Sequence, residues 1–248
     1  MVDSLAGLVL AAGAGTRMEP LSRVRPKPLL PFGQAALVDH AIARLRSCTT
    51  RIAVNAHHGR AEMEAHLSGR VHLSVEDRPG LGTAGGVAHA APWIGDDDLV
   101  VVNADTWCPG DLEPLAQSWD RDRIRVVVAG APVLAADSRI VASFLPAREV
   151  ARLAVEPSGL YETCWAPAAE AGRLDVVGWE GTVIDCATPR DYLTASLLRS
   201  RGHSVVGEGA VVEGTVVRSV VWPGAHVWPV EILVDAIRTD VGVTVLVR

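Results

Sequence analysis

Residues 8–33 read Leu-Val-Leu-Ala-Ala-Gly-Ala-Gly-Thr-Arg-Met-Glu-Pro-Leu-Ser-Arg-Val-Arg-Pro-Lys-Pro-Leu-Leu-Pro-Phe-Gly. An apolar strand runs directly into a loop of small residues, Ala11 to Gly15, and such loops let backbone N–H groups approach phosphate oxygens closely. Arg17 and Lys27 place two cations beside the loop, and several prolines stiffen the segment that carries them. The stretch therefore predicts a polyphosphate-binding loop at the end of a buried strand.

Two well-known phosphate loops do not fit this spacing. The Walker loop needs Gly-x4-Gly-Lys-Ser/Thr, which does not occur in the chain. The dinucleotide fingerprint needs a Gly or Ala three residues after its second glycine, and the residue three positions after Gly15 is Met18. A nicotinamide-dependent oxidoreductase is therefore disfavoured.

The rest of the chain alternates apolar runs with amphipathic stretches. We expect strands at 6–11, 51–55, 71–75, 98–103 and 124–129, and helices at 37–46, 59–68, 83–91, 111–118 and 189–199. This β-α-β rhythm predicts a mostly parallel sheet covered on both faces, an α/β fold of the Rossmann-like, three-layer kind. Ligands of such sheets bind beyond the carboxyl ends of the strands, where the phosphate loop, residues 103–105 and residues 76–86 all fall.

Two carboxylates follow apolar runs in the same layout. Asp105 comes directly after the strand expected at 98–103, and Asp185 follows Val183 and Ile184 before a turn into a helix. Thr188 and Pro189 are typical of the start of that helix. A strand-end Asp beside a phosphate loop is suited to Mg²⁺, which prefers hard oxygen ligands.

The composition changes after about residue 202. Val206 and Val212, and again Val221 and Val227, are separated by six residues. The spacing resembles the hexapeptide repeat of a left-handed β-helix, with two ordinary hairpins as the alternative. We therefore expect a catalytic domain over 1–202 and a short β-helix-like stub over 203–248. Two coils cannot bury their own faces, so the stub should pack on the catalytic domain or on a second subunit, as in a homodimer.

The segment Gly13 to Pro31 resembles the signature G-x-G-T-R-x-x-P-L-T-x-x-x-P-K-P-L-L-P of the sugar-1-phosphate nucleotidyltransferases, with Ser22 in place of the usual Thr. Residues 76–86 resemble the segment with which that family reads the nucleoside, and residues 54–58 resemble its V-N-x-H segment. Residues 183–192 resemble its second metal-ligand segment, with Cys186 and Ala187 in place of Val-Gly.

The resemblance implies the transfer of a nucleotidyl group from a nucleoside triphosphate to a sugar 1-phosphate, with release of pyrophosphate. GTP and a mannose-1-phosphate-like acceptor are favoured, as in the mannose-1-phosphate guanylyltransferase branch. UTP- or dTTP-using transferases and a catalytically silent regulatory homologue are the alternatives. An acyltransferase, suggested by the hexapeptide tail, would need more coils than this chain has.

Residue roles carry over position by position. Arg17, Lys27 and Asp105 are the expected catalytic residues, and Asp105 and Asp185 the expected ligands of Mg²⁺. Lys27, Asn55, Asp105 and Glu156 are expected to bind substrate. The expected nucleotide-binding residues are Leu10, Ala11, Ala12, Gly13, Ala14, Gly15, Thr16, Arg17, Gly82, Thr83 and Ala84.

One departure from the family concerns the acceptor side. Many relatives have Glu-Lys-Pro in mid-chain, and its lysine grips the sugar phosphate. Here residues 154–157 read Ala-Val-Glu-Pro, and Lys27 is the only lysine of the chain. Arg148 or Arg152 could take the place of the missing lysine.

Composition sets the outer limits. A chain of 248 residues with 49% hydrophobic content allows one α/β domain and a small appendage. A net charge of −6 argues against a nucleic-acid partner. No long apolar run or basic leader is present, so we expect a soluble, cytoplasmic protein that does not enter a membrane. The four cysteines lack the paired spacing of a zinc site or a disulfide framework.

Overall fold

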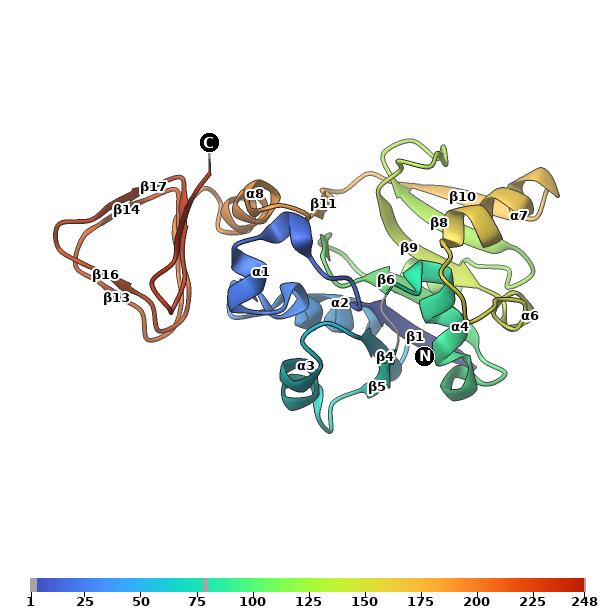
Figure 1. The fold of residues 1–248 in the computed structure, drawn as a ribbon. Helices are drawn as coiled ribbons and strands as arrows, with labels where there is room; N and C mark the ends of the chain where they lie inside the picture. The colour runs from blue at the N-terminus through green and yellow to red at the C-terminus, as the bar shows by residue number, and fades with distance from the viewer. Residues whose placement is uncertain (1–3, 78–79, 248) are drawn as a thin grey trace. The chain divides into compact units, whose positions relative to one another are not determined.

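The computed structural model describes residues 4–77 and 80–247. Its contacts divide the chain into two compact units (Figure 1). The first unit comprises the chain up to Gly13 together with Ala41–Val183, and the second comprises Ala14–His40 together with Ile184–Arg248. Among the described residues, no helix has the length and the apolar character needed to cross a membrane.

The first unit is built on one large sheet, whose strands are labelled in Figure 1. Within the described residues the strand order is β10-β8-β9-β6-β1-β4-β5. All neighbouring pairs are parallel except those made by β9, which is antiparallel to β6 and β8. This confirms the predicted mostly parallel sheet. The strands are β1 (Leu5–Leu10), β4 (Arg51–Ala56), β5 (His72–Val75), β6 (Asp98–Asn103), β8 (Ile124–Ala129), β9 (Ile140–Leu145) and β10 (Leu174–Trp179).

Helices cover both faces of this sheet. Leu8 of β1 belongs to a buried cluster that includes residues of α4, α6 and α7. Its neighbour Gly7 points the other way, and a Cβ there would lie 3.0 Å from Leu45 of α2. On that second face Trp119 packs against Phe144, with ring centroids 5.5 Å apart. The three-layer prediction is therefore confirmed. The helices are α2 (Leu37–Leu45), α3 (Arg60–Leu67), α4 (Gly82–Ile94), α5 (Glu113–Gln117), α6 (Ala147–Val150) and α7 (Ala166–Glu170).

The second unit joins the proline-rich segment to the C-terminal part of the chain. Its short elements are η1 (Thr16–Met18), α1 (Leu21–Val24), η2 (Lys27–Leu29), β2 (Pro31–Phe32), β3 (Ala35–Ala36) and β11 (Ile184–Asp185). Helix α8 (Pro189–Arg199) begins with a capping box, in which Thr188 and Asp191 bond reciprocally. The predicted helix start at Thr188 and Pro189 is thereby confirmed.

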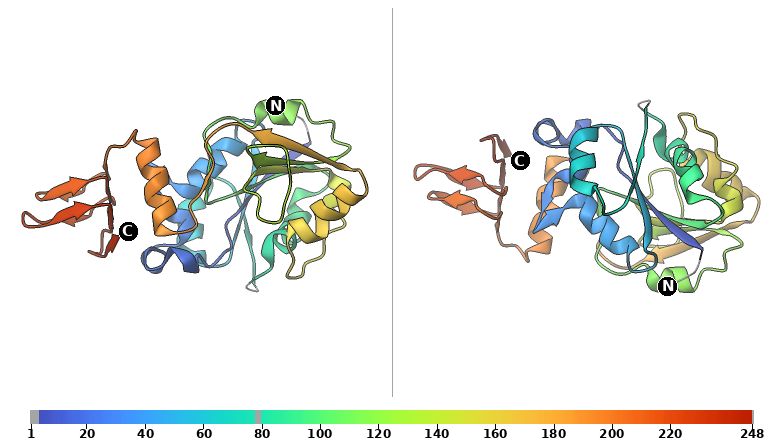
Figure 2. Two further views of the ribbon diagram at one scale, coloured as in Figure 1. Left: turned by 90° about the horizontal axis from the view of Figure 1, so that it is seen from above. Right: turned by 90° about the horizontal axis from the view of Figure 1, so that it is seen from below.

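The tail of this unit is a short three-sided coil (Figure 1). Its strands pair in parallel across successive turns of the coil. Strand β12 pairs with β15, β15 with β18, β13 with β16, and β14 with β17. Two further views show these paired strands in orange and red (Figure 2). Parallel pairing is the β-helix-like arrangement and excludes the two-hairpin alternative. The strands are β12 (Val205–Val206), β13 (Val211–Val212), β14 (Thr215–Val217), β15 (Val220–Val221), β16 (His226–Val227), β17 (Ile232–Val234), β18 (Ala236–Arg238) and the antiparallel β19 (Thr244–Leu246).

The coil packs on the proline-rich segment of its own chain. Trp222 is completely buried, and the Arg25 guanidinium lies 5.4 Å from its ring centroid. The same guanidinium donates a hydrogen bond of 3.2 Å to Asp240. Arg25 lies two residues before Lys27, so the coil supports the segment that carries this lysine.

We expect Trp222→Ala to lower the free energy of unfolding by about 3–5 kcal/mol, because it empties a large buried site. Trp228→Ala is the matched control in the same coil. Trp228 is 54% exposed, so its loss should cost less than about 1 kcal/mol. Thermal denaturation of both variants measures the difference. Equal melting temperatures for the two variants would contradict the packing role of Trp222.

Candidate active site

Backbone pairing sets the start of the phosphate loop. Leu10, the last residue of β1, is in register with Asn103, the last residue of β6. The Ala104 N–H donates to the Leu10 carbonyl at 3.0 Å, and the Ala11 N–H donates to Asn55 Oδ1 at 2.5 Å. Asp105 therefore follows β6 at the same sheet edge at which the loop leaves β1.

Two buried polar side chains, Asn55 and Glu76, hold the start of the loop at this sheet edge. Asn55 and Glu76 are 2% and 3% exposed, and Asn55 Nδ2 donates to Glu76 Oε1 at 2.7 Å. A Cβ at Gly86 of α4 would lie 2.7 Å from Asn55 Nδ2, so the helix packs tightly against the pair. Burial raises the pKa of the Glu76 carboxyl, while the hydrogen bond from Asn55 opposes that rise. Both ends of the Asn55 amide are thus used within the protein, and its predicted contact with substrate stays a prediction.

We expect Asn55→Ala to lower the free energy of unfolding by about 2–3 kcal/mol. The substitution leaves the Ala11 N–H and the Glu76 carboxyl buried without this partner, and each unsatisfied group costs about 1–3 kcal/mol. His58→Ala is the control, because the His58 side chain is exposed and His58 lies three residues after Asn55 in the sequence. Urea denaturation checks both, and an Asn55→Ala chain as stable as the control would refute the anchoring role.

The first turn of α4, residues 82–85, packs against the chain segment that precedes a π-helical turn, η3 (Tyr161–Trp165). A Cβ at Gly82 would collide with the Ser158 carbonyl, and Gly82 has a φ of +69°, a region that favours glycine. The Ala84 N–H donates to the Ser158 carbonyl at 3.0 Å, and the Leu160 N–H donates to Thr83 Oγ1 at 2.8 Å. The glycine is therefore required for this packing, whether or not its backbone also contacts a base.

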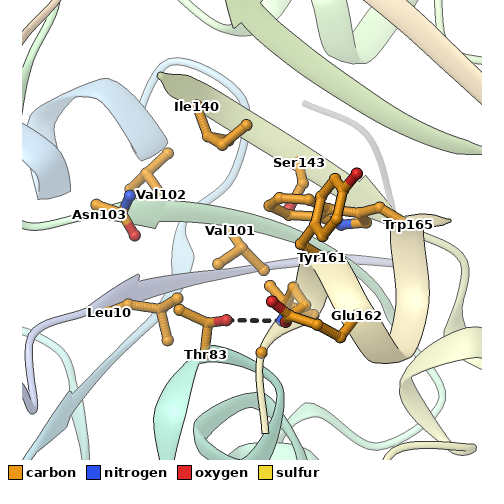
Figure 3. Close-up of a pocket in the computed structure, with 12 residues that line it drawn as sticks. Leu10, Thr83, Val101, Val102, Asn103, Ile140, Ser143, Tyr161, Glu162 and Trp165 are labelled. Carbon is orange, nitrogen blue, oxygen red and sulfur yellow. Dashed lines mark hydrogen bonds between the residues drawn. The ribbon is translucent and has the colours of Figure 1, made fainter. Parts of the chain in front are cut away.

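A cavity of about 290 Å³ opens beside these two segments (Figure 3). Its size matches the lower end of small-molecule sites. Its walls combine aliphatic and aromatic side chains with a few polar ones. They are Leu10, Thr83, Val101, Val102, Asn103, Ile140, Ser143, Gly159, Leu160, Tyr161, Glu162 and Trp165.

The second unit brings the glycine loop and the lysine together. Gly15 has a φ of +64°, and a Cβ there would lie only 2.9 Å from Lys27 Cβ. The loop thus passes directly over the aliphatic stem of Lys27, which is half-buried in η2. Arg17 lies in the intervening η1 and is exposed. A side chain at position 15 would be strained and would displace this stem.

The expected site residues fall in both units. Leu10 to Gly13, Asn55, Gly82 to Ala84, Asp105 and Glu156 belong to the first unit, and Ala14 to Arg17, Lys27 and Asp185 to the second. Asp105 and Asp185 are both half-buried. Within the described residues no cluster of three or more His, Cys, Asp or Glu side chains is present. Two carboxylates still suit Mg²⁺, which commonly keeps several water ligands and needs few from protein.

The acceptor-side residues named from the sequence are not among the residues that line this cavity, and their contact with substrate stays a prediction. Glu156 is exposed and does not line the cavity. Arg152 pairs instead with Glu149 at 3.0 Å. Sequence reasoning missed Ser143 and Glu162, which both line the cavity. The signal for Glu162 was its place directly after the Ser158–Tyr161 segment, which loosely resembles the family's sugar-side segment.

Comparison with known proteins places the chain in a family. A family model described as the MobA-like NTP transferase domain matches residues 7–177, and the chain belongs to this family. The resemblance to a nucleotidyltransferase family that the sequence predicted is thereby confirmed. An N-acetylmuramate alpha-1-phosphate uridylyltransferase of Caulobacter vibrioides is 36% identical over 132 residues, which cover 48% of this chain and 54% of that protein.

A mannose-1-phosphate guanyltransferase of Aspergillus fumigatus is 26% identical over 230 residues, covering 77% of this chain and 63% of that protein. The chain therefore spans between about half and two thirds of the length of these two relatives. Among solved structures, HddC from Yersinia pseudotuberculosis superposes with a TM-score of 0.64 at 19% identity, covering 78% of this chain and 99% of that chain. A Bacillus anthracis protein assigned as a glucose-1-phosphate thymidylyltransferase superposes with a TM-score of 0.67 at 18% identity. The superposition covers 78% of this chain and 94% of that chain. The structural likeness confirms the predicted fold.

Proposed function

We propose that this protein is a sugar-1-phosphate nucleotidyltransferase. It joins a nucleoside triphosphate and a sugar 1-phosphate to give a nucleoside-diphosphate sugar and pyrophosphate. An oxygen of the sugar phosphate attacks the α-phosphorus, the bond from that phosphorus to the bridging oxygen breaks, and pyrophosphate leaves with the electron pair. The attacking oxygen is already ionised, so no general base is required.

The strongest support for this proposal is the close contact between Gly15 and the aliphatic stem of Lys27. It brings Gly15, the second glycine of a backbone loop suited to phosphate, against the stem of Lys27 within one compact unit. Two anions repel each other, so their reaction depends on positioning and on charge neutralisation. Lys27 would bridge the α-phosphate and the incoming phosphate, and Arg17 would hold the pyrophosphate that leaves.

Asp105 and Asp185 would hold Mg²⁺. When bound, this ion neutralises phosphate charge and orients the α-phosphate. The donor chemistry fits, since both side chains are half-buried carboxylates that follow strands. Asn55 and Glu76 would act behind the site by holding the first residue of the phosphate loop through the Ala11 N–H.

GTP is our first choice of nucleotide, and UTP or dTTP the alternative. The guanyltransferase relative aligns over 77% of this chain, against 48% for the uridylyltransferase relative. The cavity of the first unit would receive the acceptor sugar, with mannose 1-phosphate as the leading candidate. Its aromatic and aliphatic walls suit the faces of a sugar ring.

Release of pyrophosphate tests the proposal directly. GTP, UTP, dTTP and ATP are each incubated with Mg²⁺ and with mannose, glucose, N-acetylglucosamine or N-acetylmuramate 1-phosphate. We expect pyrophosphate only when triphosphate, sugar phosphate and Mg²⁺ are all present. Absence of release with every pair would reject the proposed activity and favour a silent homologue.

A further inference from the structure

The charge of the acceptor cavity is unusual for a site that receives a phosphate ester. Among its described lining residues there is no lysine, arginine or histidine, and Glu162 carries the one carboxylate. Among the described residues that line this cavity, an anionic group would therefore meet a carboxylate and no cationic side chain.

The Glu162 carboxylate lies against the backbone of Gly159. A Cβ at Gly159 would collide with Glu162 Oε2, so the carboxylate lies directly over the backbone of this glycine. Both residues line the cavity, and Figure 3 shows Glu162 beside Thr83 at its lower edge. The absence of a side chain at position 159 therefore makes room for the carboxylate at the cavity wall.

The rest of the cavity favours an uncharged, hydroxyl-rich ligand. Tyr161 and Trp165 lie one turn apart on the π-helical turn and both face the cavity (Figure 3). Within the part of the chain that the structure describes, the indole N–H of Trp165 has no hydrogen-bond partner although it is buried. Ser143 and Asn103 add neutral polar groups from two neighbouring strands.

We propose that Glu162 makes this enzyme select sugar 1-phosphates whose ring carries no anionic substituent, through hydrogen bonds from sugar hydroxyls to its carboxylate. Acceptors with a second acidic group, such as the lactyl carboxylate of N-acetylmuramate 1-phosphate, are rejected by like-charge repulsion. A carboxylate that accepts hydrogen bonds from sugar hydroxyls forms stronger hydrogen bonds than a neutral acceptor does. This inference rests on the proposed function.

The test compares kcat/KM for the best uncharged sugar 1-phosphate with that for N-acetylmuramate 1-phosphate. Like charges juxtaposed in a binding site repel each other. Glu162 is exposed at the cavity wall, so solvent screens part of this repulsion, and we expect the wild-type ratio to be roughly tenfold or more. Glu162→Gln removes the charge and keeps the shape, and should lower this ratio at least about tenfold, which corresponds to 1.4 kcal/mol. Glu170→Gln is the matched control, since Glu170 is exposed on α7 and does not line the cavity.

The outcomes separate the two proposals. A wild-type ratio near one, or a ratio that Glu162→Gln leaves unchanged, overturns the selectivity role even if the enzyme is active. A ratio that falls equally in Glu170→Gln overturns it as well, because the effect would then be a general one of surface charge. Failure of every triphosphate and sugar phosphate to release pyrophosphate overturns the proposed function instead, and this inference with it.

Discussion

Lys27→Ala should lower kcat by two or more orders of magnitude while the protein remains folded. The ammonium group is proposed to neutralise charge that grows as the two phosphates meet, and loss of one such donor typically costs about 3–4 kcal/mol. Lys27 is the only lysine of the chain, so no other ammonium side chain can take its place. Steady-state measurement of pyrophosphate release gives kcat directly.

Arg23→Ala is the control for this substitution. Arg23 lies on the same segment, and its side chain is 74% exposed and paired with Glu19, four residues earlier. Its removal should change kcat less than about twofold, because exposed pairs contribute little. Circular dichroism and melting temperature must remain near wild type in both variants. A Lys27→Ala enzyme that keeps more than a third of wild-type turnover would disprove the assigned role.

Much of the fold could be predicted from apolar periodicity. The five expected strands all form within the sheet of the first unit. Four of them are mostly apolar runs, and residues 71–75 alternate apolar and polar side chains, which is the period of a strand. Strands β9 and β10 were not predicted. Strand β9 enters the sheet antiparallel between β6 and β8, and its direction depends on a long connection after β8 that has no periodic pattern.

The phosphate loop stays a prediction, and it could be made because its chemistry is local. Glycines and cations within twenty residues indicate a phosphate site without knowledge of tertiary contacts. The cavity could not be predicted in the same way. Glu162 reaches it through a π-helical turn, in which one extra residue per turn changes which side chains share a face. The role of Gly82 likewise depends on Ser158, a residue far along the chain.

Asp105→Asn and Asp185→Asn should each reduce Mg²⁺-dependent turnover to background. Both carboxylates are proposed to bind one ion, and an amide oxygen carries no charge with which to hold it. The double variant should then be no slower than the worse single variant, because the first substitution already empties the site. Turnover of the three variants at several Mg²⁺ concentrations measures this directly.

A second measurement does not depend on turnover. A ligand that binds only the folded protein stabilises it by RT ln(1 + [L]/Kd), so Mg²⁺ with GTP should raise the wild-type melting temperature more than GTP alone. Each Asn variant should lose this extra rise, whereas Asp111→Asn, at an exposed position near Asp105, should keep it. If the double variant is much slower than either single variant, or if Asp185→Asn keeps the full rise, then the two carboxylates act independently. In that case Asp105 would be assigned to the phosphate site without Asp185, since it is Asp105 that follows β6 beside the start of the loop.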